Sequence, residues 1–221
     1  MNEQGPAPGS LDSETEITLG LLNAVHENSA LTQRSVAGEL GIALGLANAY
    51  LKRCVKKGLI KVKQAPPNRY LYYLTPKGFA EKSRLTAEYL SYSFTFFRRA
   101  RHECAELFAE CRERGWGRVA LAGTGDLGEI ATLCARDFPV TLAGFADGGA
   151  GVSRFAGLEV AGLEDLGPVD AVVVTDLVSP QATYDALAEF LAPERVLAPP
   201  LLHVTRKGAG PTAGKEKEGA S

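Results

Sequence analysis

The sequence predicts an α+β winged helix-turn-helix followed by an α/β Rossmann-like parallel sheet, with a long helix joining the two. Three observations carry this prediction. Residues 13–78 hold three short helical patterns and then a β-hairpin pattern, and residues 79–114 hold a long helical pattern without proline or glycine. Residues 115–205 alternate between strand and helix patterns, which is typical of a parallel sheet with right-handed crossovers. The remaining residues, 1–12 and 206–221, are expected to be disordered tails, because they lack core-forming side chains.

The elements of the first domain follow from caps and periodicity. The first helix is expected to begin at Ser13-x-x-Glu16, a capping box that precedes apolar residues at helical spacing. The second and third helices are expected at about 32–40 and 44–57, because each pattern ends at a glycine. Two β-patterns, 59–63 and 70–74, flank the turn QAPPNR, so a hairpin closes the domain.

The long helix carries an apolar stripe at three- and four-residue spacing, and such a stripe needs a partner surface. Its members are Leu90, Phe94, Phe97, Cys104, Phe108 and Cys111. We expect the stripe to form the interface of a homodimer; the alternative is that it packs within the chain on one of the two domains. Cys104 and Cys111 share one helix face, where oxidation would bridge them across a dimer, although small residues of a packed seam are the simpler interpretation.

Gly115-Trp116-Gly117 marks the boundary between the long helix and the second domain. Alternating apolar and helical patterns follow it, with the apolar runs short enough for strands. The expected strands are 118–122, 140–145, 158–160, 171–175 and 195–198, and the expected helices are 126–136 and 181–191.

Charge is distributed unevenly along the chain, although the net charge is only −2. Residues 30–114 carry sixteen Lys and Arg against seven Asp and Glu, a local net charge of +9, whereas residues 115–208 carry six against twelve, a net charge of −6. This asymmetry favours two domains with different partners, and the basic part is the candidate for nucleic acid.

Composition excludes several classes of protein. The apolar runs are too short for a membrane span, and the first residues, MNEQGPAPGS, lack the basic and apolar regions of a secretory signal. The four cysteines form no C-x-x-C pair and have no histidine at metal-ligand spacing. We therefore expect reduced thiols, no metal site and a cytoplasmic location.

The third helix separates its side chains onto two faces. One face, expected to pack on the first two helices, consists of Ala47, Leu51, Cys54 and Val55. The other face is expected to enter the major groove of double-stranded DNA, where Asn48 would pair with an adenine edge. Residues 30–70 carry eight basic residues against one acid, a bias that phosphates favour without reading sequence. The alternative is a winged helix that binds protein and exposes a solvated basic helix.

The expected DNA contacts come from the second helix, the third helix and the hairpin. Gln33 is a further candidate for adenine, and the basic side chains would bind phosphates. The full set is Gln33, Arg34, Ser35, Leu44, Gly45, Asn48, Ala49, Lys52, Arg53, Lys56, Lys61, Lys63, Asn68 and Arg69.

This domain resembles the MarR-type winged helix, and specifically the small regulators associated with exopolysaccharide gene clusters. The matching residues are Gln33-Arg34-Ser35, Gly41-Ile42, Leu44-Gly45, Asn48, Leu51-Lys52, Lys57-Gly58-Leu59, Lys61-Val62, Leu74-Thr75-Pro76-x-Gly78, Glu81-Lys82 and Leu85-Thr86. The resemblance covers about residues 13–95 and implies a dimeric, DNA-binding transcriptional regulator. Those small regulators stop after the long helix, so the resemblance implies nothing about residues 115–205.

A dinucleotide-binding fingerprint opens the second domain. The apolar run 119–122 precedes Gly123-x-Gly125-x-x-Gly128, and a helical pattern follows. In that order the glycines allow a tight turn, the approach of a pyrophosphate to the backbone, and packing of helix on strand. Asp147 follows about twenty residues later, where an acid would bind ribose hydroxyls. The expected ligand-binding residues are Gly123, Thr124, Gly125, Asp126, Leu127, Gly128, Asp147, Thr175 and Asp176.

The second domain resembles the Rossmann-type domain of CoA-binding proteins, Rex-type redox-sensing repressors and the front domains of some nucleotide-sugar enzymes. The residues that carry this resemblance are the fingerprint, Gly144-Phe145-x-Asp147, Gly157, Leu163-Glu164-Asp165-Leu166 and Val169-Asp170. NAD(H) and nucleotide sugars are the candidate ligands. Asp126 and Glu129 depart from the pattern, because negative charges at the helix N-terminus would repel a phosphate. A Rossmann-like domain that binds no ligand is therefore the alternative.

Together these features predict a transcriptional regulator whose Rossmann-like domain senses a nucleotide-containing effector. The long helix would transmit the effect of binding to the recognition helices. No enzyme is predicted, because His26, His102 and His203 have no visible nucleophile or acid as a partner. Two alternatives stay open: an enzyme or enzyme subunit of nucleotide-sugar or polysaccharide metabolism, and an architectural regulator whose Rossmann-like domain is ligand-free.

Overall fold

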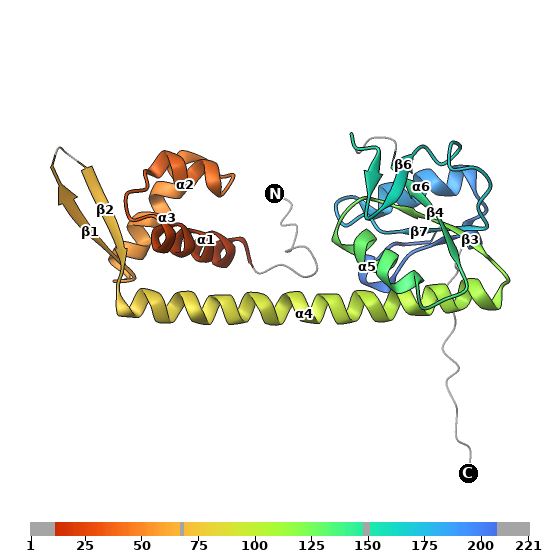
Figure 1. Cartoon of the computed structure of the whole chain (residues 1–221), viewed down its shortest axis with the longest axis horizontal. Coiled ribbons are helices and arrows are strands. Elements are labelled where there is room, and N and C mark those ends of the chain that lie inside the picture. The colour runs from red at the N-terminus through yellow and green to blue at the C-terminus, as the bar shows by residue number, and fades with distance from the viewer. Residues whose placement is uncertain (1–11, 67–68, 148–150, 207–221) are drawn as a thin grey trace, which may run out of the picture. The chain divides into compact units, whose positions relative to one another are not determined.

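The computed structural model describes residues 12–66, 69–147 and 151–206 (Figure 1). The chain divides into two compact units, residues 1–97 and 98–221. The division falls within α4 (Pro76–Glu113), so this 38-residue helix contributes its first part to one unit and its last part to the other. The predicted fold class is confirmed: a winged helix-turn-helix, a long helix and a largely parallel sheet. Over the described residues, no helix combines the length and apolar character needed to cross a membrane.

The N-terminal unit consists of three short helices, a hairpin and the first part of α4. The elements are α1 (Ser13–Glu27), α2 (Gln33–Glu39), α3 (Leu44–Lys56), β1 (Ile60–Ala65) and β2 (Arg69–Leu74). The two strands pair antiparallel, and the outer edge of β2 is tied to the α1–α2 loop by Tyr72 N, which donates to Ser29 O at 2.8 Å. One apolar core unites these elements, and Leu85 of α4 is part of it.

The capping box predicted at Ser13 is wrong, because Ser13 is already the first helical residue of α1. Asp12 is the N-cap residue there, and its side chain makes no capping hydrogen bond. A reciprocal capping box begins α2 instead. Ser35 N donates to Thr32 Oγ1 at 3.1 Å, and Thr32 N donates to Ser35 Oγ at 2.9 Å. A serine at the third helical position thus takes the place of the usual Glu or Gln.

The start of α4 is fixed by Thr75-Pro76-x-Gly78. Thr75 Oγ1 accepts a hydrogen bond from Gly78 N at 3.0 Å and donates to Gly58 O at 2.6 Å, while Pro76 occupies the first helical position. A Cβ atom on Gly78 would lie 2.0 Å from Leu59 O. Glycine is therefore required where α4 passes the start of the hairpin.

The C-terminal unit contains a six-stranded sheet in the order β5-β6-β4-β3-β7-β8 (Figure 1). Its strands are β3 (Arg118–Ala122), β4 (Thr141–Ala146), β5 (Arg154–Phe155), β6 (Leu158–Ala161), β7 (Ala171–Val174) and β8 (Val196–Leu197). All neighbours pair parallel except β5 and β6, an antiparallel pair that the sequence patterns did not predict. The helices α5 (Asp126–Ala135) and α6 (Pro180–Phe190) are the crossovers from β3 to β4 and from β7 to β8.

The apolar stripe of α4 does not form one continuous exposed seam. Cys104, Phe108 and Cys111 are fully buried within the C-terminal unit, where Phe108 packs on Phe138 with ring centroids 6.0 Å apart. Burial raises the pKa of the Cys104 thiol to about 12 and that of Cys111 to about 11. The predicted interface role of these three residues, and an intermolecular bridge between the two thiols, are therefore wrong. They are core residues because α4 has the sheet domain as an intramolecular partner.

Candidate nucleic-acid interface and fingerprint loop

The third helix, α3, buries one face and exposes the other. Ala47, Leu51 and Cys54 are buried, as expected, but Val55 is 36% exposed and lies at the margin of the packed face. The side opposite the buried residues carries Gly45, Ala49, Lys52 and Lys56, all exposed. We call these four residues the outer face of α3.

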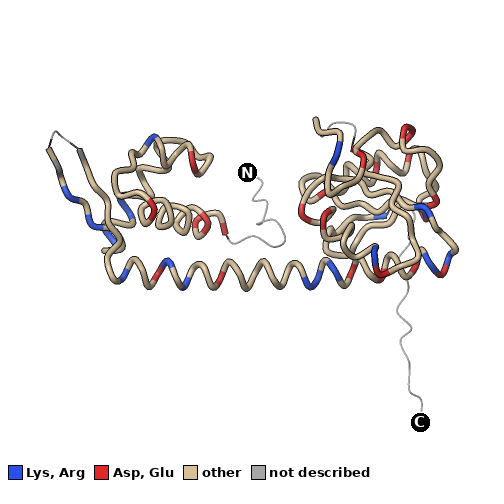
Figure 2. The backbone as a smooth tube through the Cα atoms, viewed as in Figure 1, with Lys and Arg blue, Asp and Glu red and all other residues tan. Residues whose placement is uncertain are grey.

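Lys and Arg positions occur on α3 and on β1 of the adjacent hairpin (Figure 2). Lys61 and Lys63 are exposed on β1, and Lys63 Nζ lies 5.9 Å from the ring centroid of Tyr73. Arg53 is also exposed, but it forms an ion pair with Glu14 of α1 and lies over the ring of Tyr50. Among the described residues of this surface, Lys52, Lys56 and Lys61 are therefore exposed cations without an ion pair or ring contact.

Asn48 does not present a complete amide to solvent. Its Oδ1 atom is buried and accepts no hydrogen bond from any described residue. Bidentate pairing with adenine uses both the oxygen and the nitrogen of the amide. The adenine-reading role predicted for Asn48 thus requires a rotation of the side chain out of its present position.

Three of the expected contacts, two on α2 and one on α3, line a hollow of about 550 Å³. Gln33 and Arg34 line it together with Leu44, Tyr70 and Tyr72. The Ser35 hydroxyl is occupied by the α2 cap, where it also donates to Thr32 O at 2.8 Å. Asn68 and the side chain of Arg69 lie outside the described residues.

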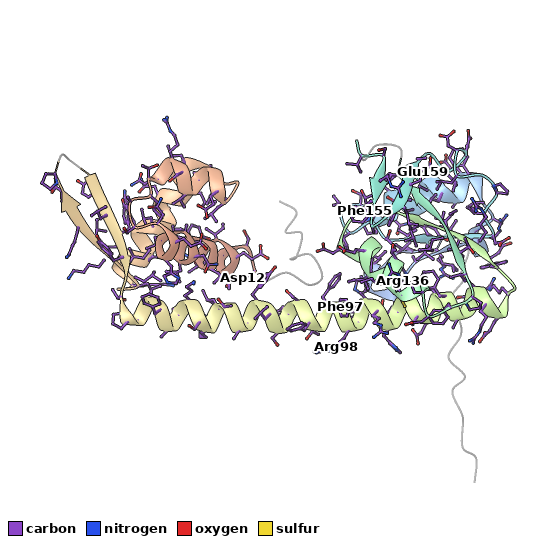
Figure 3. The ribbon with its side chains drawn as sticks, in the orientation of Figure 1. Asp12, Phe97, Arg98, Arg136, Phe155 and Glu159 are labelled. Carbon is purple, nitrogen blue, oxygen red and sulfur yellow. The ribbon has the colours of Figure 1, made fainter. Side chains whose placement is uncertain are left out.

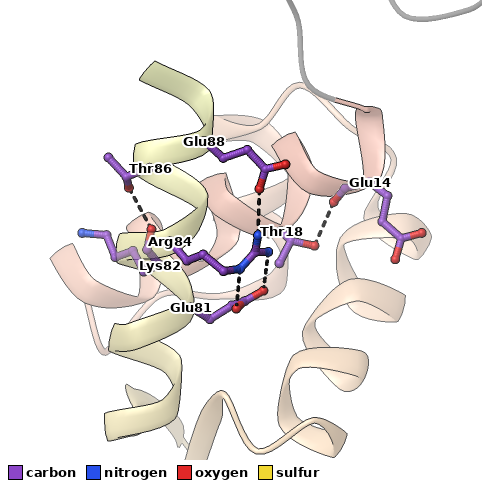
Figure 4. A network of polar contacts seen from close by, with 7 residues as sticks. All are labelled: Glu14, Thr18, Glu81, Lys82, Arg84, Thr86 and Glu88. Atoms are coloured by element: carbon purple, nitrogen blue, oxygen red, sulfur yellow. Dashed lines mark hydrogen bonds and ion pairs between the residues drawn. The ribbon is translucent and has the colours of Figure 1, made fainter. Parts of the chain in front are cut away.

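Arg84 of α4 is basic but compensated within its own helix (Figure 4). Its guanidinium donates to Glu81 Oε1 and Oε2 at 2.9 and 3.0 Å, and to Glu88 Oε2 at 2.8 Å. The hydrogen bonds with Glu81, more than any other influence, raise the pKa of Arg84 and lower that of Glu81. This cluster therefore adds no net positive charge to the surface formed by α3 and β1.

In the C-terminal unit, the strand order reverses direction between β3 and β7. Chain order proceeds outward from β3 through β4 to β6 on one side, and from β7 to β8 on the other. The carboxyl ends of β3 and β7 are therefore the topological switch point, where open α/β sheets bind ligands. The segment Gly123–Gly128, which we call the fingerprint loop, comprises the turn after β3 and the first three residues of α5 at this edge.

Two fingerprint glycines are required by packing, and the third is not. Gly123 has φ +112°, and a Cβ on it would lie 2.5 Å from Asp176 N. A Cβ on Gly128 would lie 2.7 Å from the Phe145 ring and 2.8 Å from Gly123 O. A Cβ on Gly125 would meet no described atom within 4 Å, and its φ of 174° is open to any residue.

The other expected ligand residues are largely engaged by the fold. Thr175 Oγ1 donates to Gly123 O at 2.7 Å, and Leu127 is fully buried. Asp176 accepts hydrogen bonds from Val178 N, Ser179 N and Thr183 Oγ1 before and within α6. A side-chain contact between Leu127 and a ligand is excluded by this burial.

Asp147 faces the fingerprint loop from the end of β4. Its Oδ2 accepts hydrogen bonds from Thr124 Oγ1 at 3.0 Å and Thr124 N at 3.3 Å, whereas no described donor bonds its Oδ1. Asp126 and Glu129 are exposed in the first turn of α5. The structure thus brings Asp147 and the loop together, in an environment that carries three acids. Among the described residues, no group of His, Cys, Asp and Glu side chains could hold a metal ion.

Comparison with known proteins identifies the N-terminal unit. The family model for winged helix-turn-helix DNA-binding domains matches residues 14–61, from α1 to the start of β1. The N-terminal unit is a winged helix-turn-helix. No curated protein sequence matches the chain.

Several solved structures are similar to part of this chain. The ligand-bound PcaV transcriptional regulator of Streptomyces coelicolor is 24% identical, with 37% of this chain and 59% of that chain covered and a TM-score of 0.34. MepR, a transcription regulator of the Staphylococcus aureus multidrug efflux pump MepA, is 26% identical, with 38% and 61% covered and a TM-score of 0.33. Human N-acetylserotonin methyltransferase is 12% identical, with 72% and 66% covered and a TM-score of 0.27. The chain thus spans about three fifths of the length of these two regulators.

Proposed function

We propose that this chain is a DNA-binding transcriptional regulator of the MarR type. The observation that carries the proposal is the winged helix-turn-helix match over residues 14–61, combined with lysines on the outer face of α3 and on β1 that the fold does not use. Lysine ammonium groups on one surface favour a polyanion, because their binding releases counterions from the phosphate backbone. The proposal assigns no catalytic reaction to the chain.

The test is duplex binding as a function of salt concentration. We expect the full-length protein to bind a random-sequence duplex with an affinity that falls steeply between about 50 and 200 mM salt. Lys52→Ala and Lys56→Ala should each reduce the slope of log affinity against log salt by about 0.9. Arg136→Ala serves as the matched control, because it removes one exposed positive charge at the end of α5 in the C-terminal unit. Equal slopes for all four proteins would overturn the proposal.

We infer that the regulator is a homodimer held by the central part of α4. Leu90, Phe94 and Phe97 of the predicted stripe share one side of the helix and are 46%, 58% and 40% exposed. Figure 3 shows the Phe97 side chain on α4. An exposed apolar cluster of this density is typical of a surface that another molecule covers. A second copy of α4 offers the same cluster and therefore a self-complementary contact.

The dimer is tested by charge substitution on that cluster. Phe94→Asp combined with Phe97→Asp should convert the dimer into a monomer in light scattering, since two carboxylates cannot be buried in an apolar contact without a large cost. Phe190→Asp changes an exposed phenylalanine of α6 in the same way and should leave the mass unchanged. A dimer that survives the double substitution would place the interface elsewhere.

We further propose that the fingerprint loop binds a nucleotide-containing effector. The observation that favours a ligand is Gly125, the N-cap residue of α5, because its φ is open to any residue and a Cβ there would meet no described atom within 4 Å, so that neither backbone conformation nor packing requires glycine. A ligand that approaches the backbone closely would give a reason for glycine at this position. The Oδ1 atom of Asp147 supports the same proposal, because it is an acceptor suited to a ribose hydroxyl.

A further inference from the structure

The first two turns of α3 present an almost purely apolar surface. Gly45 and Ala49 lie on the outer face, and Leu44 and Leu46 are 46% and 41% exposed on either side of it. Leucines exposed to this degree on one short helix form a patch that a partner is expected to cover. Cationic side chains enter the outer face only in the third and fourth turns, with Lys52 and Lys56.

Glycine at position 45 has no explanation within the unit. A Cβ there would meet no described atom within 4 Å, and the position is helical, where glycine is less favourable than alanine. Together with Ala49 one turn later, it leaves a smooth strip on which the helix can approach another surface closely.

Hydrogen-bonding groups are scarce on this part of the helix. Asn48 is the one side chain in the first two turns with an amide, and its Oδ1 atom is buried. Direct readout of adenine or guanine needs paired donors and acceptors, which this surface does not offer in its present form. Apolar contact with the 5-methyl group of thymine needs only a methyl or methylene partner.

We propose that α3 reads DNA through thymine 5-methyl groups, with Ala49 as the central contact and Leu44 and Leu46 on either side of it. This inference rests on the proposed DNA-binding function and names the chemistry of its specificity. The occupant of the apolar patch is the major groove of a thymine-containing duplex rather than a protein, because Lys52 and Lys56 continue the same face of α3 beyond the patch and complement phosphates. The lysines hold the duplex without reading sequence, and the patch discriminates among sequences.

Replacement of thymine by uracil tests this proposal, because it removes the 5-methyl group and leaves every hydrogen-bonding edge unchanged. A duplex is first selected from a random-sequence pool with the full-length protein, and each thymine is then replaced by uracil in turn. At each contacted position the affinity should fall about fourfold, the value of one buried methyl group. Replacement of cytosine by 5-methylcytosine at the other positions shows whether an added methyl is tolerated there.

Two variants connect the effect to α3. Ala49→Gly removes the central methyl partner, so at one position the affinities for the thymine and uracil duplexes should become about equal. Ala49→Ser has a size and helix propensity closer to those of alanine, and it should also reduce the ratio of these two affinities. Lys52→Ala, as the matched control, should weaken thymine and uracil duplexes equally and leave every ratio unchanged.

The outcomes separate this inference from the function on which it rests. A selected duplex without thymine, or uracil duplexes that bind as tightly as thymine duplexes at every position, would overturn methyl readout while DNA binding stands. Absence of binding to any duplex at low salt would overturn both. A position-specific loss that Ala49→Gly abolishes and Lys52→Ala preserves is the expected result.

Discussion

The outer face of α3 and the fingerprint loop were both expected to bind a ligand, and the fold treats them differently. On α3, Lys52 and Lys56 are exposed and contribute nothing visible to the packing of their own unit. In the fingerprint loop, Gly123 and Gly128 are needed for close packing, and Thr175 holds a carbonyl of that loop. Only those residues of a motif that the fold does not itself require are evidence for function. In and beside the fingerprint loop, these are Gly125 and the Oδ1 atom of Asp147.

The difference has an energetic cause. A surface lysine costs the folded state almost nothing, so its presence in a cluster calls for a partner outside the chain. A glycine at positive φ or against a backbone atom is enforced by sterics, so it persists in a Rossmann-like domain with or without a ligand. The strength of evidence from the two motifs thus differs even though both match their patterns equally well.

Substitution of the three fingerprint glycines should give the largest effects and would break or sharpen this comparison directly. Gly123→Ala should destabilise the C-terminal unit by about 3 kcal/mol, since it combines a positive φ with overlap of a backbone atom. Gly128→Ala should cost about 2 kcal/mol by crowding the Phe145 ring and Gly123 O. Gly125→Ala should cost less, at most about 1 kcal/mol, since only the preference for glycine over alanine at the N-cap of α5 is lost.

Hydrogen–deuterium exchange of peptides from β3, α5 and β7 measures these changes within the C-terminal unit alone. Gly125→Ala is the internal control, because it introduces the same methyl group in the same loop. Strong destabilisation by Gly125→Ala would remove the structural argument for a ligand at that position, since glycine would then be needed by the fold itself.

Periodicity predicted most of the fold, because core-facing residues must recur with the period of their element. The strand at 118–122 and the start of α5 at Asp126 were predicted at the residues where the structure has them. The antiparallel pair β5–β6 escaped prediction, because two residues in one strand are too few to show a period. The cap of α2 was missed because Ser35 replaces the Glu or Gln of the usual pattern.

The sites were less predictable than the fold, since sequence patterns do not show which polar atoms the fold consumes. Asp176 and Thr175 stand at the end of a strand on the ligand edge, as expected, yet their side chains bond to the chain itself. The apolar stripe of α4 was mispredicted for a related reason. Spacing shows that an apolar face will be buried, but it does not show whether the partner surface lies within the chain, as for Phe108, or outside it, as proposed for Phe94.

Substitutions that alter ligand binding at the fingerprint loop should have effects of intermediate size, and they test whether this loop binds a ligand at all. NAD⁺, coenzyme A and UDP-glucose are the probes, measured by titration calorimetry with the full-length protein. For a pyrophosphate ligand, Asp147→Ala should weaken binding about tenfold by removing a ribose acceptor. Asp126→Asn should tighten the same ligand severalfold, because a negative charge at the start of α5 opposes the phosphates.

Glu189→Gln is the control for Asp126→Asn, because it changes the net charge by the same amount at an exposed position in the last turn of α6. Tighter binding with both variants would indicate a general charge effect rather than a local one. No heat from any of the three probes, with the wild type or with Asp126→Asn, would contradict the proposed nucleotide effector and favour a domain kept for assembly.

The smallest expected effect concerns Asp176, which the fold uses and which a ligand therefore should not need. Partial burial raises the pKa of this carboxyl, but hydrogen bonds from Thr183 Oγ1, Val178 N and Ser179 N outweigh burial and leave the pKa below its ordinary value of 3.8. A carboxyl with a lowered folded-state pKa stabilises the fold fully above the unfolded-state pKa, and this contribution is lost as pH falls through the folded-state pKa. Asp176→Ala should therefore cost about 1 kcal/mol near pH 7, the value of a helix cap. The difference from the wild type should shrink steadily below about pH 4 as the wild-type carboxylate takes up its proton.

Hydrogen exchange of α6 peptides, measured between about pH 7 and pH 3, gives both the cost of Asp176→Ala and its dependence on pH. A wild-type advantage that persists unchanged at pH 3 would show that the stabilisation by Asp176 does not depend on its ionised carboxylate, and would contradict the hydrogen bonds to that carboxylate as the reason for its lowered pKa.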